Sequence, residues 1–223
     1  MYASIKRFFD IVFSLLALLI LSPLFIVIIL ILKFTGEGEV FYKQQRVGFR
    51  NRRFGIWKFA TMVKNSAKIG AGDVTLRNDP RVTAFGRFLR ITKINELPQM
   101  INILSGDMSF VGPRPLMPEG FYRYSPLLQG IIYNVVPGLT GIGSIVFRDE
   151  EMIVSNSALS PHDCYTQIIM PYKGELEVWY QKKAGFATDL RLLLLTIWYV
   201  IFPNSKLVYK VFSDLPKRMP QLV

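Results

Sequence analysis

The hydropathy pattern begins with an uncharged, strongly apolar run. No charged residue occurs from Ile11 to Leu32, and a helix of this length, at about 1.5 Å per residue, matches the hydrocarbon core of a bilayer. Pro23 lies in the middle of the run, where it removes one backbone donor, while the neighbouring Ser22 hydroxyl can bond a freed carbonyl. The pattern predicts a membrane helix hinged at Ser22 and Pro23.

Basic residues flank this run on both sides. Lys6 and Arg7 precede it, and a series of lysines and arginines follows between positions 33 and 53. Such flanks are typical of the cytoplasmic side, so neither end favours crossing. We therefore expect residues 1–34 to enter one leaflet and return as a re-entrant helix, with a bitopic helix as the open alternative. A signal peptide is disfavoured because no cleavage site follows the long run.

Shorter elements follow the membrane segment. Val40–Tyr42 and Phe54–Phe59 have the composition of strands around a basic loop, which predicts a β-hairpin. Apolar residues recur at helical spacing in Val82–Ile91 and in Asn95–Leu104, which predicts two short helices. Residues 64–80 show little periodicity and predict a loop.

The second half of the chain combines rigid segments with two helices. Prolines on both sides of Arg114 restrict the backbone, which predicts an extended, rigid segment. Pro137–Gly143 has the composition of a turn whose glycines, Gly138 and Gly141, adopt positive φ. Lys173–Lys183 predicts a polar helix. A helix over Leu190–Phe202 would be too short to span a bilayer, so it would lie at the membrane interface or in the core.

These elements together predict an α+β fold in two parts. Residues 1–34 form the re-entrant membrane helix. Residues 35–223 form a small, mostly helical cytoplasmic domain with a short β-hairpin and interfacial amphipathic helices. The length of 223 residues agrees with one sizeable domain plus a membrane element.

Composition narrows the classes of function. Hydrophobic residues make up 51% and charged residues 19% of the chain, which is typical neither of a disordered chain nor of an ordinary soluble protein. The formal charge of +11 suits a polyanionic partner such as nucleic acid, acidic lipid or a phosphorylated substrate. A single cysteine and a single histidine exclude an internal disulfide and a Cys/His metal cluster, so any metal requires oxygen ligands.

Candidate chemistry is concentrated in a group of arginines and oxygen-bearing side chains. Arginine forks bind phosphate oxygens, and a neighbouring carboxylate can hold Mg²⁺. Phosphate handling is one interpretation of the group; a set of surface pairs worth under about 1 kcal/mol each is the other. The members are Arg81, Arg87, Arg90, Asn95, Glu96, Asp107 and Arg114.

Short motifs in a recognisable order cover almost the whole chain. They are Lys6-Arg7 with Asp10, Ser22-Pro23, Gln45-Arg46-Val47-Gly48, Lys58-Phe59-Ala60-Thr61-Met62, Asp79-Pro80-Arg81, Gly86-Arg87-Phe88-Leu89-Arg90, Asn95-Glu96-Leu97-Pro98-Gln99, Gly106-Asp107-Met108-Ser109, Gly112-Pro113-Arg114-Pro115 and Pro137-Gly138-Leu139-Thr140-Gly141. In this order the motifs resemble the bacterial sugar transferase family. Its members are monotopic phosphoglycosyl transferases that move a phosphosugar from a nucleoside diphosphate sugar to polyprenol phosphate.

The resemblance implies a function and a location. The reaction is transfer of a phosphosugar from a UDP-sugar to polyprenol (undecaprenyl) phosphate at the cytoplasmic face of the bacterial inner membrane. This step initiates assembly of a lipid-linked glycan for capsule, O-antigen, exopolysaccharide or glycoprotein. The implied cofactor is Mg²⁺, membrane lipids are further partners, and a homodimer is left open. No nucleic acid is expected, because no module that binds it is present. The sugar, set by the loops at 64–78 and 145–172, is not named by the sequence.

The family's acidic pair falls on Asn95 and Glu96, where this chain departs from the pattern. The usual first residue is an aspartate to which attack on the sugar-bearing phosphate is attributed, and an amide is a far weaker nucleophile. Three explanations stay open: a subset of the family that uses an Asn-Glu pair, an engineered trap, or chemistry through Glu96. The alternative function is a catalytically impaired, membrane-tethered binder of nucleotide sugar or polyprenol phosphate. Both residues are also the implied metal ligands.

Further site residues come from the same resemblance. Lys58, Arg90 and Arg114 match family positions that serve phosphate or cofactor binding, and Asp189 lies where a C-terminal family aspartate is expected. Arg81 is another candidate for substrate binding, although a solvated surface residue is the simpler interpretation.

Overall fold

The computed structural model describes residues 2–35, 37–64, 66 and 79–217. Most of the predicted loop at 64–80 therefore lies outside the described residues. The chain divides into two units, which are treated separately below. The first unit comprises Met1–Phe8, Gln45–Phe54 and Gly106–Val223, and the second comprises Phe9–Gln44 and Gly55–Ser105.

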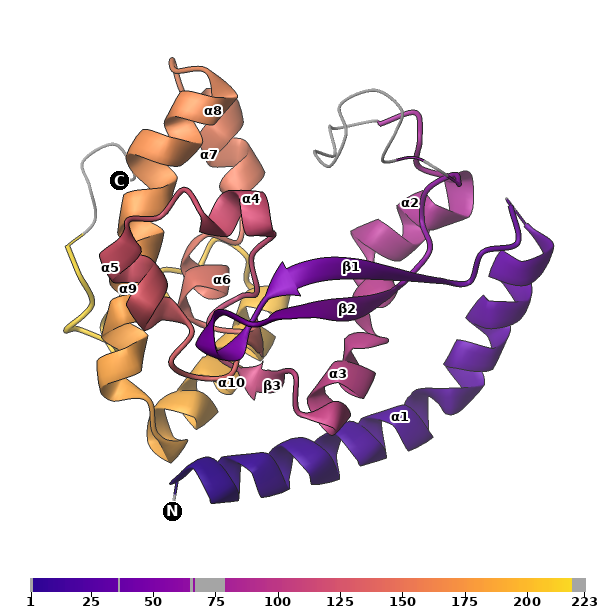
Figure 1. Cartoon of the computed structure of the whole chain (residues 1–223), viewed down its shortest axis with the longest axis horizontal. Helices are drawn as coiled ribbons and strands as arrows, with labels where there is room; N and C mark the ends of the chain where they lie inside the picture. The colour runs from indigo at the N-terminus through magenta and orange to yellow at the C-terminus, as the bar shows by residue number, and fades with distance from the viewer. Residues whose placement is uncertain (1, 36, 65, 67–78, 218–223) are drawn as a thin grey trace. The chain divides into compact units, whose positions relative to one another are not determined.

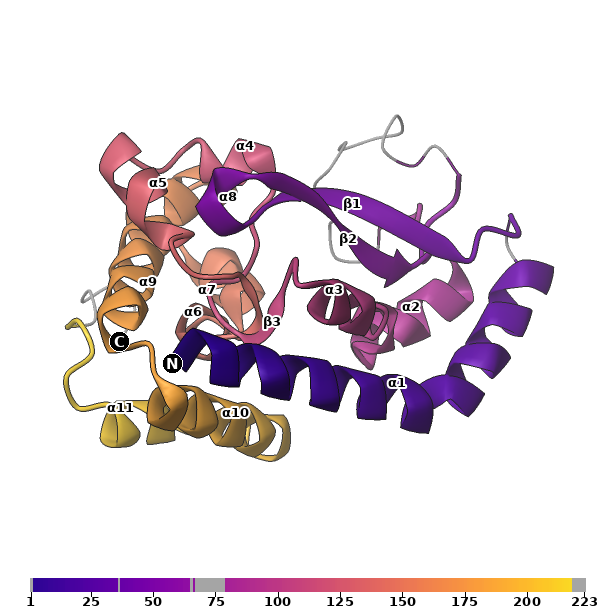
Figure 2. The ribbon, with the colours of Figure 1, turned by 60° about the horizontal axis from the view of Figure 1, so that its bottom comes forward.

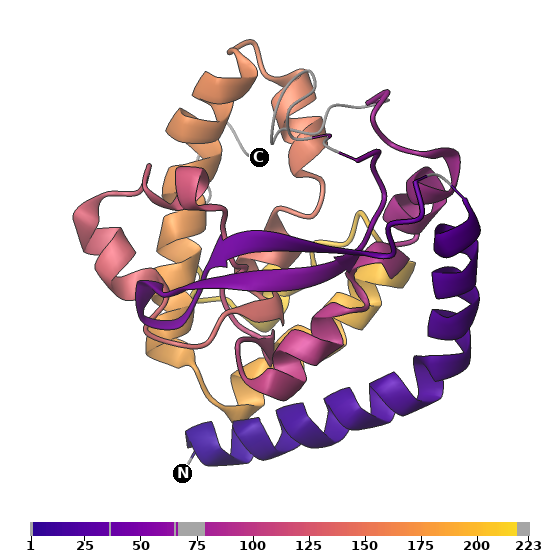
Figure 3. The same cartoon turned by 45° about the vertical axis from the view of Figure 1, so that its right-hand side comes forward.

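The N-terminal apolar run forms one helix, α1 (Tyr2–Phe34), with Pro23 inside it. Pro23 has no N–H for the carbonyl of Leu19, and the Ser22 hydroxyl donates a hydrogen bond to that carbonyl at 2.7 Å. The ribbon of α1 changes direction within its length (Figures 1 and 3). By length and composition α1 can cross a membrane, with a mean hydropathy of 3.3 in its most apolar window. The re-entrant course stays a prediction.

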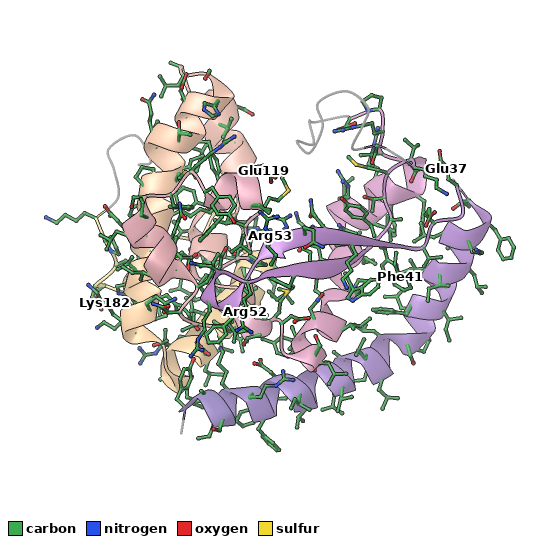
Figure 4. The ribbon with its side chains drawn as sticks, in the orientation of Figure 1. Glu37, Phe41, Arg52, Arg53, Glu119 and Lys182 are labelled. Carbon is green, nitrogen blue, oxygen red and sulfur yellow. The ribbon has the colours of Figure 1, made fainter. Side chains whose placement is uncertain are left out.

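The predicted β-hairpin is confirmed, with longer strands than expected. Strands β1 (Phe41–Val47) and β2 (Arg53–Phe59) pair antiparallel and are joined by a 3₁₀ turn, η1 (Phe49–Asn51). Arg52 and Arg53 lie at this end of the hairpin with exposed side chains (Figure 4). Part of the chain's positive charge therefore faces solvent.

The two short helices predicted after the loop are also present. They are α2 (Ala84–Ile91) and α3 (Gln99–Ser105), with a 3₁₀ turn, η3 (Ile94–Glu96), between them. Lys93 has a φ of 59°, a left-handed conformation that ends the first helix and redirects the chain. The acidic-pair position therefore lies in a tight turn between two helices.

The core of the second unit joins α1 to the hairpin and α2. Its fully or nearly buried members are Ile28 and Leu32 of α1, Phe59 of β2 and Leu89 of α2. Phe41, labelled in Figure 4, stacks on Phe59 with 5.4 Å between ring centroids. Only one stripe of α1 packs into this core, and most of the other apolar side chains of the helix are exposed.

The first unit contains a second pair of strands, which corrects one sequence prediction. Strand β3 (Ser109–Val111) pairs in parallel with β4 (Gly138–Thr140), and a short helix, α6 (Ile142–Val146), follows. The predicted turn over 137–143 is therefore wrong. Because parallel pairing is a long-range contact, the local glycine-rich composition gave no sign of it.

The glycines of this segment serve close packing rather than positive φ. Neither Gly138 nor Gly141 is among the residues with a positive φ. A Cβ atom at Gly138 would lie 2.1 Å from the Gly112 nitrogen, and one at Gly141 would lie 2.2 Å from the Gly112 oxygen. These positions need glycine because two backbone segments approach each other without room for a side chain.

The other helices of the first unit surround these strands. They are α4 (Pro118–Phe121), α5 (Pro126–Ile132), α7 (Glu150–Asn156), α8 (Pro161–Cys164), the π-helical turn η4 (Tyr165–Ile169), α9 (Met170–Lys183), α10 (Phe186–Ile201) and α11 (Leu207–Val211). Figure 2 shows α11 next to α10. The helices predicted at 173–183 and 190–202 are thus confirmed as α9 and α10.

The two long helices of this unit compare differently with their sequence patterns. The segment of helix α9 predicts a polar helix, yet its Lys173 and Glu177 are buried. Helix α10 packs one face into the unit through Leu192 and Leu195, while apolar side chains such as Leu194 on its other face are exposed. The exposed face agrees with an interfacial helix, a role that stays a prediction.

Candidate active site

Lys58 and Glu96 form an ion pair in the second unit. Lys58 Nζ lies 3.4 Å from Glu96 Oε1, and the two side chains are 16% and 18% exposed. The pair forms because Asn102 attaches α3 to strand β2. Its Oδ1 accepts a hydrogen bond from the Trp57 N–H at 2.9 Å, and its Nδ2 donates to the Gly55 carbonyl at 2.9 Å. A cation therefore lies beside the carboxylate of the predicted pair.

Asn95, the first residue of that pair, is 8% exposed. Its Oδ1 has no hydrogen-bond partner among the described residues, and the same holds for Nε2 of Gln99, which is 3% exposed. Leaving a buried polar group unsatisfied costs about 1–3 kcal/mol. These two amide atoms therefore indicate a site where solvent, a metal or a substrate supplies the missing partner.

Arg90 is held in a defined orientation near the end of α2. Its Nε donates a hydrogen bond to Thr61 Oγ1 at 2.8 Å. Burial lowers the pKa of the half-buried Arg90 guanidinium, the nearby Asp79 opposes that shift and Arg81 adds to it. An arginine stays protonated in such a setting. Arg90 is thus a partly desolvated cation whose orientation Thr61 fixes.

Arg81 is buried, so the interpretation as a solvated surface residue is wrong. Its Nη2 lies 2.7 Å from Asp79 Oδ2, and its Nε donates to Asp79 Oδ1 at 2.9 Å. A further bond runs from Nη1 to the Ser66 carbonyl at 2.9 Å. Breaking a buried pair of this kind costs about 3–5 kcal/mol. Its guanidinium is engaged by the protein, and its predicted part in substrate binding remains untested.

Arg114 belongs to the first unit, in a segment between β3 and α4 that is neither helix nor strand. The Tyr133 hydroxyl donates to the Arg114 carbonyl at 2.9 Å and accepts from the Leu116 N–H at 2.8 Å. Burial raises the pKa of Tyr133, which keeps the phenol protonated as a donor. The side chain of Arg114 is exposed on this fixed backbone.

Asp189 also belongs to the first unit, in the first turn of α10. It accepts hydrogen bonds from Tyr2 at 2.6 Å and from Tyr180 at 2.7 Å, and it forms an ion pair with Lys6. Lys6 in turn donates to the Val111 carbonyl at 2.8 Å. Asp189 therefore anchors the start of α1 to α10 and β3. Its predicted role in substrate binding remains untested.

The expected Mg²⁺ requires oxygen ligands. Within the described part of the chain, no group of three or more His, Cys, Asp or Glu side chains comes together. Mg²⁺ at phosphate sites commonly uses one or two protein oxygens and completes its shell with water and substrate phosphates. The Glu96 carboxylate and the unbonded Asn95 Oδ1 fit this requirement. A bound Mg²⁺ would neutralise phosphate charge during transfer.

Sequence reasoning missed several residues that support these groups. Thr61 lies three residues after Lys58 in the same recognised motif, which was a usable signal. Asn102 and Tyr133 gave no such signal, because each acts on a segment distant in the sequence. Gln99 was part of a motif without an assigned role.

An N-terminal helix that could anchor in a membrane, an α+β fold and a lysine–glutamate pair in the same unit as an oriented arginine are the features that the structure provides for assigning a class. Residues 1–203 match the model of the bacterial sugar transferase family. The chain belongs to this family, and the resemblance found in the motifs is confirmed.

Individual relatives extend the comparison. The chain is 34% identical over 205 residues to the undecaprenyl-phosphate glucose phosphotransferase of Komagataeibacter xylinus, covering 90% of this chain and 36% of the relative. It is 40% identical over 163 residues to the undecaprenyl-phosphate galactose phosphotransferase of Salmonella typhimurium, covering 66% and 33%. The exopolysaccharide production protein ExoY of Sinorhizobium fredii is 34% identical over 171 residues, covering 70% and 75%. The chain thus spans about a third of the length of the first two relatives.

Proposed function

We propose that this chain transfers a phosphosugar from a UDP-sugar to polyprenol phosphate, the initiating step of lipid-linked glycan assembly. The names of the relatives, undecaprenyl-phosphate glucose and galactose phosphotransferases, support this reaction. The observation that carries the proposal is the Lys58–Glu96 pair, which lies in the same unit as the oriented Arg90. Cations and a carboxylate are the groups that phosphoryl transfer uses.

The residues divide the work as follows. Arg90 and Lys58 bind phosphate oxygens and hold the charge that develops on them. In the first route, Glu96 attacks the sugar-bearing phosphorus and releases UMP, and polyprenol phosphate then attacks the resulting acyl phosphate. In the second route, Glu96 activates polyprenol phosphate, which attacks the sugar-bearing phosphorus directly and releases UMP. In both routes the phosphoanhydride bond breaks and a new bond to the polyprenol phosphate oxygen forms. Asn95 contributes an oxygen ligand rather than a nucleophile.

Release of UMP is the direct test. The purified chain is incubated with polyprenol phosphate, Mg²⁺ and each of a panel of UDP-sugars, and UMP is separated and quantified. We expect UMP release with at least one UDP-sugar. Sustained release should require the lipid acceptor, whereas the covalent route alone would release one UMP per enzyme without it. Binding of a UDP-sugar without UMP release would instead support the impaired binder, which the amide at Asn95 favours.

Replacing Asn95 by Asp tests which role the amide has. We expect turnover of Asn95→Asp to be unchanged or lower. A second carboxylate beside Glu96 places two like charges together, which raises the pKa of one of the two acids. Steady-state UMP release measures the effect. A rise on the order of 10²-fold would contradict this expectation and show that the amide disables a covalent route.

Two apolar surfaces support a membrane location. We propose that α1 dips into the inner membrane from the cytoplasmic side and returns, and that the exposed apolar face of α10 lies at head-group depth. Both regions expose apolar side chains, including Leu19 and Ile20 on α1 and Ile197 and Val200 on α10. The basic flanks of α1 favour the cytoplasmic side for both of its ends.

The hinge prediction is tested by replacing Pro23 with Leu. The variant restores the backbone bond to the Leu19 carbonyl and straightens α1, so part of the population should span the bilayer. Single cysteines at Ser4 and Thr35, introduced with Cys164 replaced by Ser, are labelled from each side of sealed vesicles. In the parent both are expected to react from the same side, and in part of the Pro23→Leu population from opposite sides.

The matched control for the hinge is Leu24→Ile, which changes the adjacent apolar residue and keeps the proline. It should label like the parent. Labelling of Ser4→Cys and Thr35→Cys from opposite sides in the parent itself would mean that α1 spans the bilayer.

A further inference from the structure

Gln99, the first residue of α3, is a buried glutamine with an unused hydrogen-bond donor. Its side chain is 3% exposed, and its Nε2 has no hydrogen-bond partner among the described residues. An amide nitrogen carries two hydrogens, so two donor positions are unsatisfied in a desolvated place. Because such a group destabilises the fold by itself, its partner is expected to come from outside the chain.

Asn102 on the same helix shows what a structural amide does in this unit. It is 1% exposed, and both ends of its amide are bonded to the backbone of β2, at Trp57 and Gly55. These two bonds hold α3 against the strand. The Nε2 atom of Gln99 makes no bond of this kind, so attachment of the helix does not account for it.

The contacts of its neighbours place Gln99 beside the Lys58–Glu96 pair. Backbone hydrogen bonds between residues three apart continue the helical course from η3 into α3, so side chains at this spacing share a face. Glu96, three residues before Gln99, contacts Lys58, and Asn102, three residues after it, is bonded to Trp57. Gln99 therefore lies on the face that meets β2, between these two contacts.

A second unsatisfied amide lies on the same face. Asn95, four residues before Gln99, is 8% exposed, and its Oδ1 has no hydrogen-bond partner among the described residues. The two amides therefore do not satisfy each other. Asn95 is independent evidence that a ligand completes this part of the second unit.

The charges of the same unit favour an anionic oxygen as the partner of Gln99 Nε2. Lys58 and the half-buried Arg90 are both cations of this unit, and Thr61 orients Arg90. A hydrogen bond from an N–H group to an anionic oxygen is stronger than one to a neutral oxygen. A phosphate offers several such oxygens, and an ionised phosphate oxygen brings no hydrogen that would need an acceptor in turn.

We propose that Gln99 is a phosphate-binding residue, whose Nε2 donates a hydrogen bond to a phosphate oxygen held beside Lys58 and Glu96. The inference rests on the proposed function, because that function brings phosphate to this pair. Two substrates carry the same chemistry, the diphosphate of the UDP-sugar and the phosphate of polyprenol phosphate.

Ligand binding and thermal unfolding of Gln99→Met test the proposal on the full chain in detergent with Mg²⁺. Methionine keeps the length of the side chain and removes both donor hydrogens. Calorimetric titration with UDP, and separately with polyprenol phosphate, should show an affinity weakened by about 10-fold to 100-fold for at least one probe, the effect of losing a hydrogen bond to a charged group. The thermal midpoint without ligand should equal or exceed that of the parent, because an unsatisfied buried donor is gone.

The two probes distinguish the two sources of phosphate. Loss of affinity for UDP alone assigns the bond to the nucleotide-sugar diphosphate, and loss for polyprenol phosphate alone assigns it to the lipid acceptor. Loss for both means that the two phosphates use the same amide. Gln45→Met, at an exposed glutamine on β1, is the matched control and should resemble the parent in affinity and in thermal midpoint.

Unchanged affinity of Gln99→Met for both probes would overturn the proposal. A lowered thermal midpoint would then identify a structural amide, and an equal or raised midpoint would identify an amide that binds only water. If Gln99→Met fails to fold, Gln99→Glu decides. It keeps the side-chain size but presents an acceptor instead of a donor, so it should weaken binding at least as much, and unchanged affinity would again overturn the proposal.

The proposed function fails separately from this inference, because binding of UDP and of polyprenol phosphate is measured without turnover. If the parent binds either probe through Gln99 but releases no UMP from any UDP-sugar, the phosphate site stands and the transferase activity does not.

Discussion

Glu96→Gln is expected to abolish UMP release while leaving the fold and membrane association intact. The substitution keeps the size of a side chain that is only 18% exposed and contacts Lys58, but it removes the negative charge. A neutral amide can neither attack phosphorus nor activate an acceptor, and it binds Mg²⁺ more weakly. The expected loss is about 10³-fold or more, equivalent to about 4 kcal/mol in the activation barrier.

Glu39→Gln is the matched control for this experiment. Glu39 also pairs with a lysine, Lys64, at 3.2 Å, but its side chain is 52% exposed, so its loss should have little effect. Near-parent UMP release by Glu96→Gln would contradict the assigned role. Intact-mass analysis separates the two routes, because a phosphosugar adduct on the Glu96 peptide indicates covalent transfer, whereas turnover without an adduct excludes it.

Arg90→Ala is expected to lower kcat/KM for the UDP-sugar by about 10²-fold to 10³-fold, because an oriented, desolvated guanidinium is lost from the phosphate site. Arg90→Lys should be nearly as impaired. A lysine keeps the charge, but it has no planar fork and no Nε to donate to Thr61. Steady-state kinetics of UMP release at varied UDP-sugar concentration measure both variants.

Arg87→Ala provides the comparison on the same helix, since Arg87 is exposed where Arg90 is half-buried. It should retain parent kinetics. Parent activity in Arg90→Lys would show that a positive charge is sufficient at this position. It would contradict the requirement for the planar guanidinium group.

The sequence by itself predicted the elements that depend on local physics. The apolar run predicted α1, the strand-like composition around a basic loop predicted the hairpin of β1 and β2, and the helical spacing of apolar residues predicted α2 and α3. Proline removes a backbone donor within its own helical turn, so the Ser22 bond to the Leu19 carbonyl follows from local sequence. The ordered motifs were sufficient to indicate the family.

The sequence also indicated most of the candidate site residues, but not the side chains with which they pair. Lys58 reaches Glu96 because Asn102 attaches α3 to β2, a contact across more than forty positions of chain. The orientation of Arg90 depends on Thr61, which is 29 positions away in the sequence. Side-chain pairing at such separations leaves no periodic pattern, so it could not be predicted from a single sequence.

The tertiary structure alone decided which polar residues are buried and what they do there. Arg81 was interpreted as a surface residue and is enclosed with Asp79, while Glu177 on a polar-looking helix lies in a cavity next to Arg114. Gly138 and Gly141 suggested a turn and instead allow two strands to approach. Composition records which side chains are polar, but desolvation depends on every element packed around them, and that environment exists only in the folded chain.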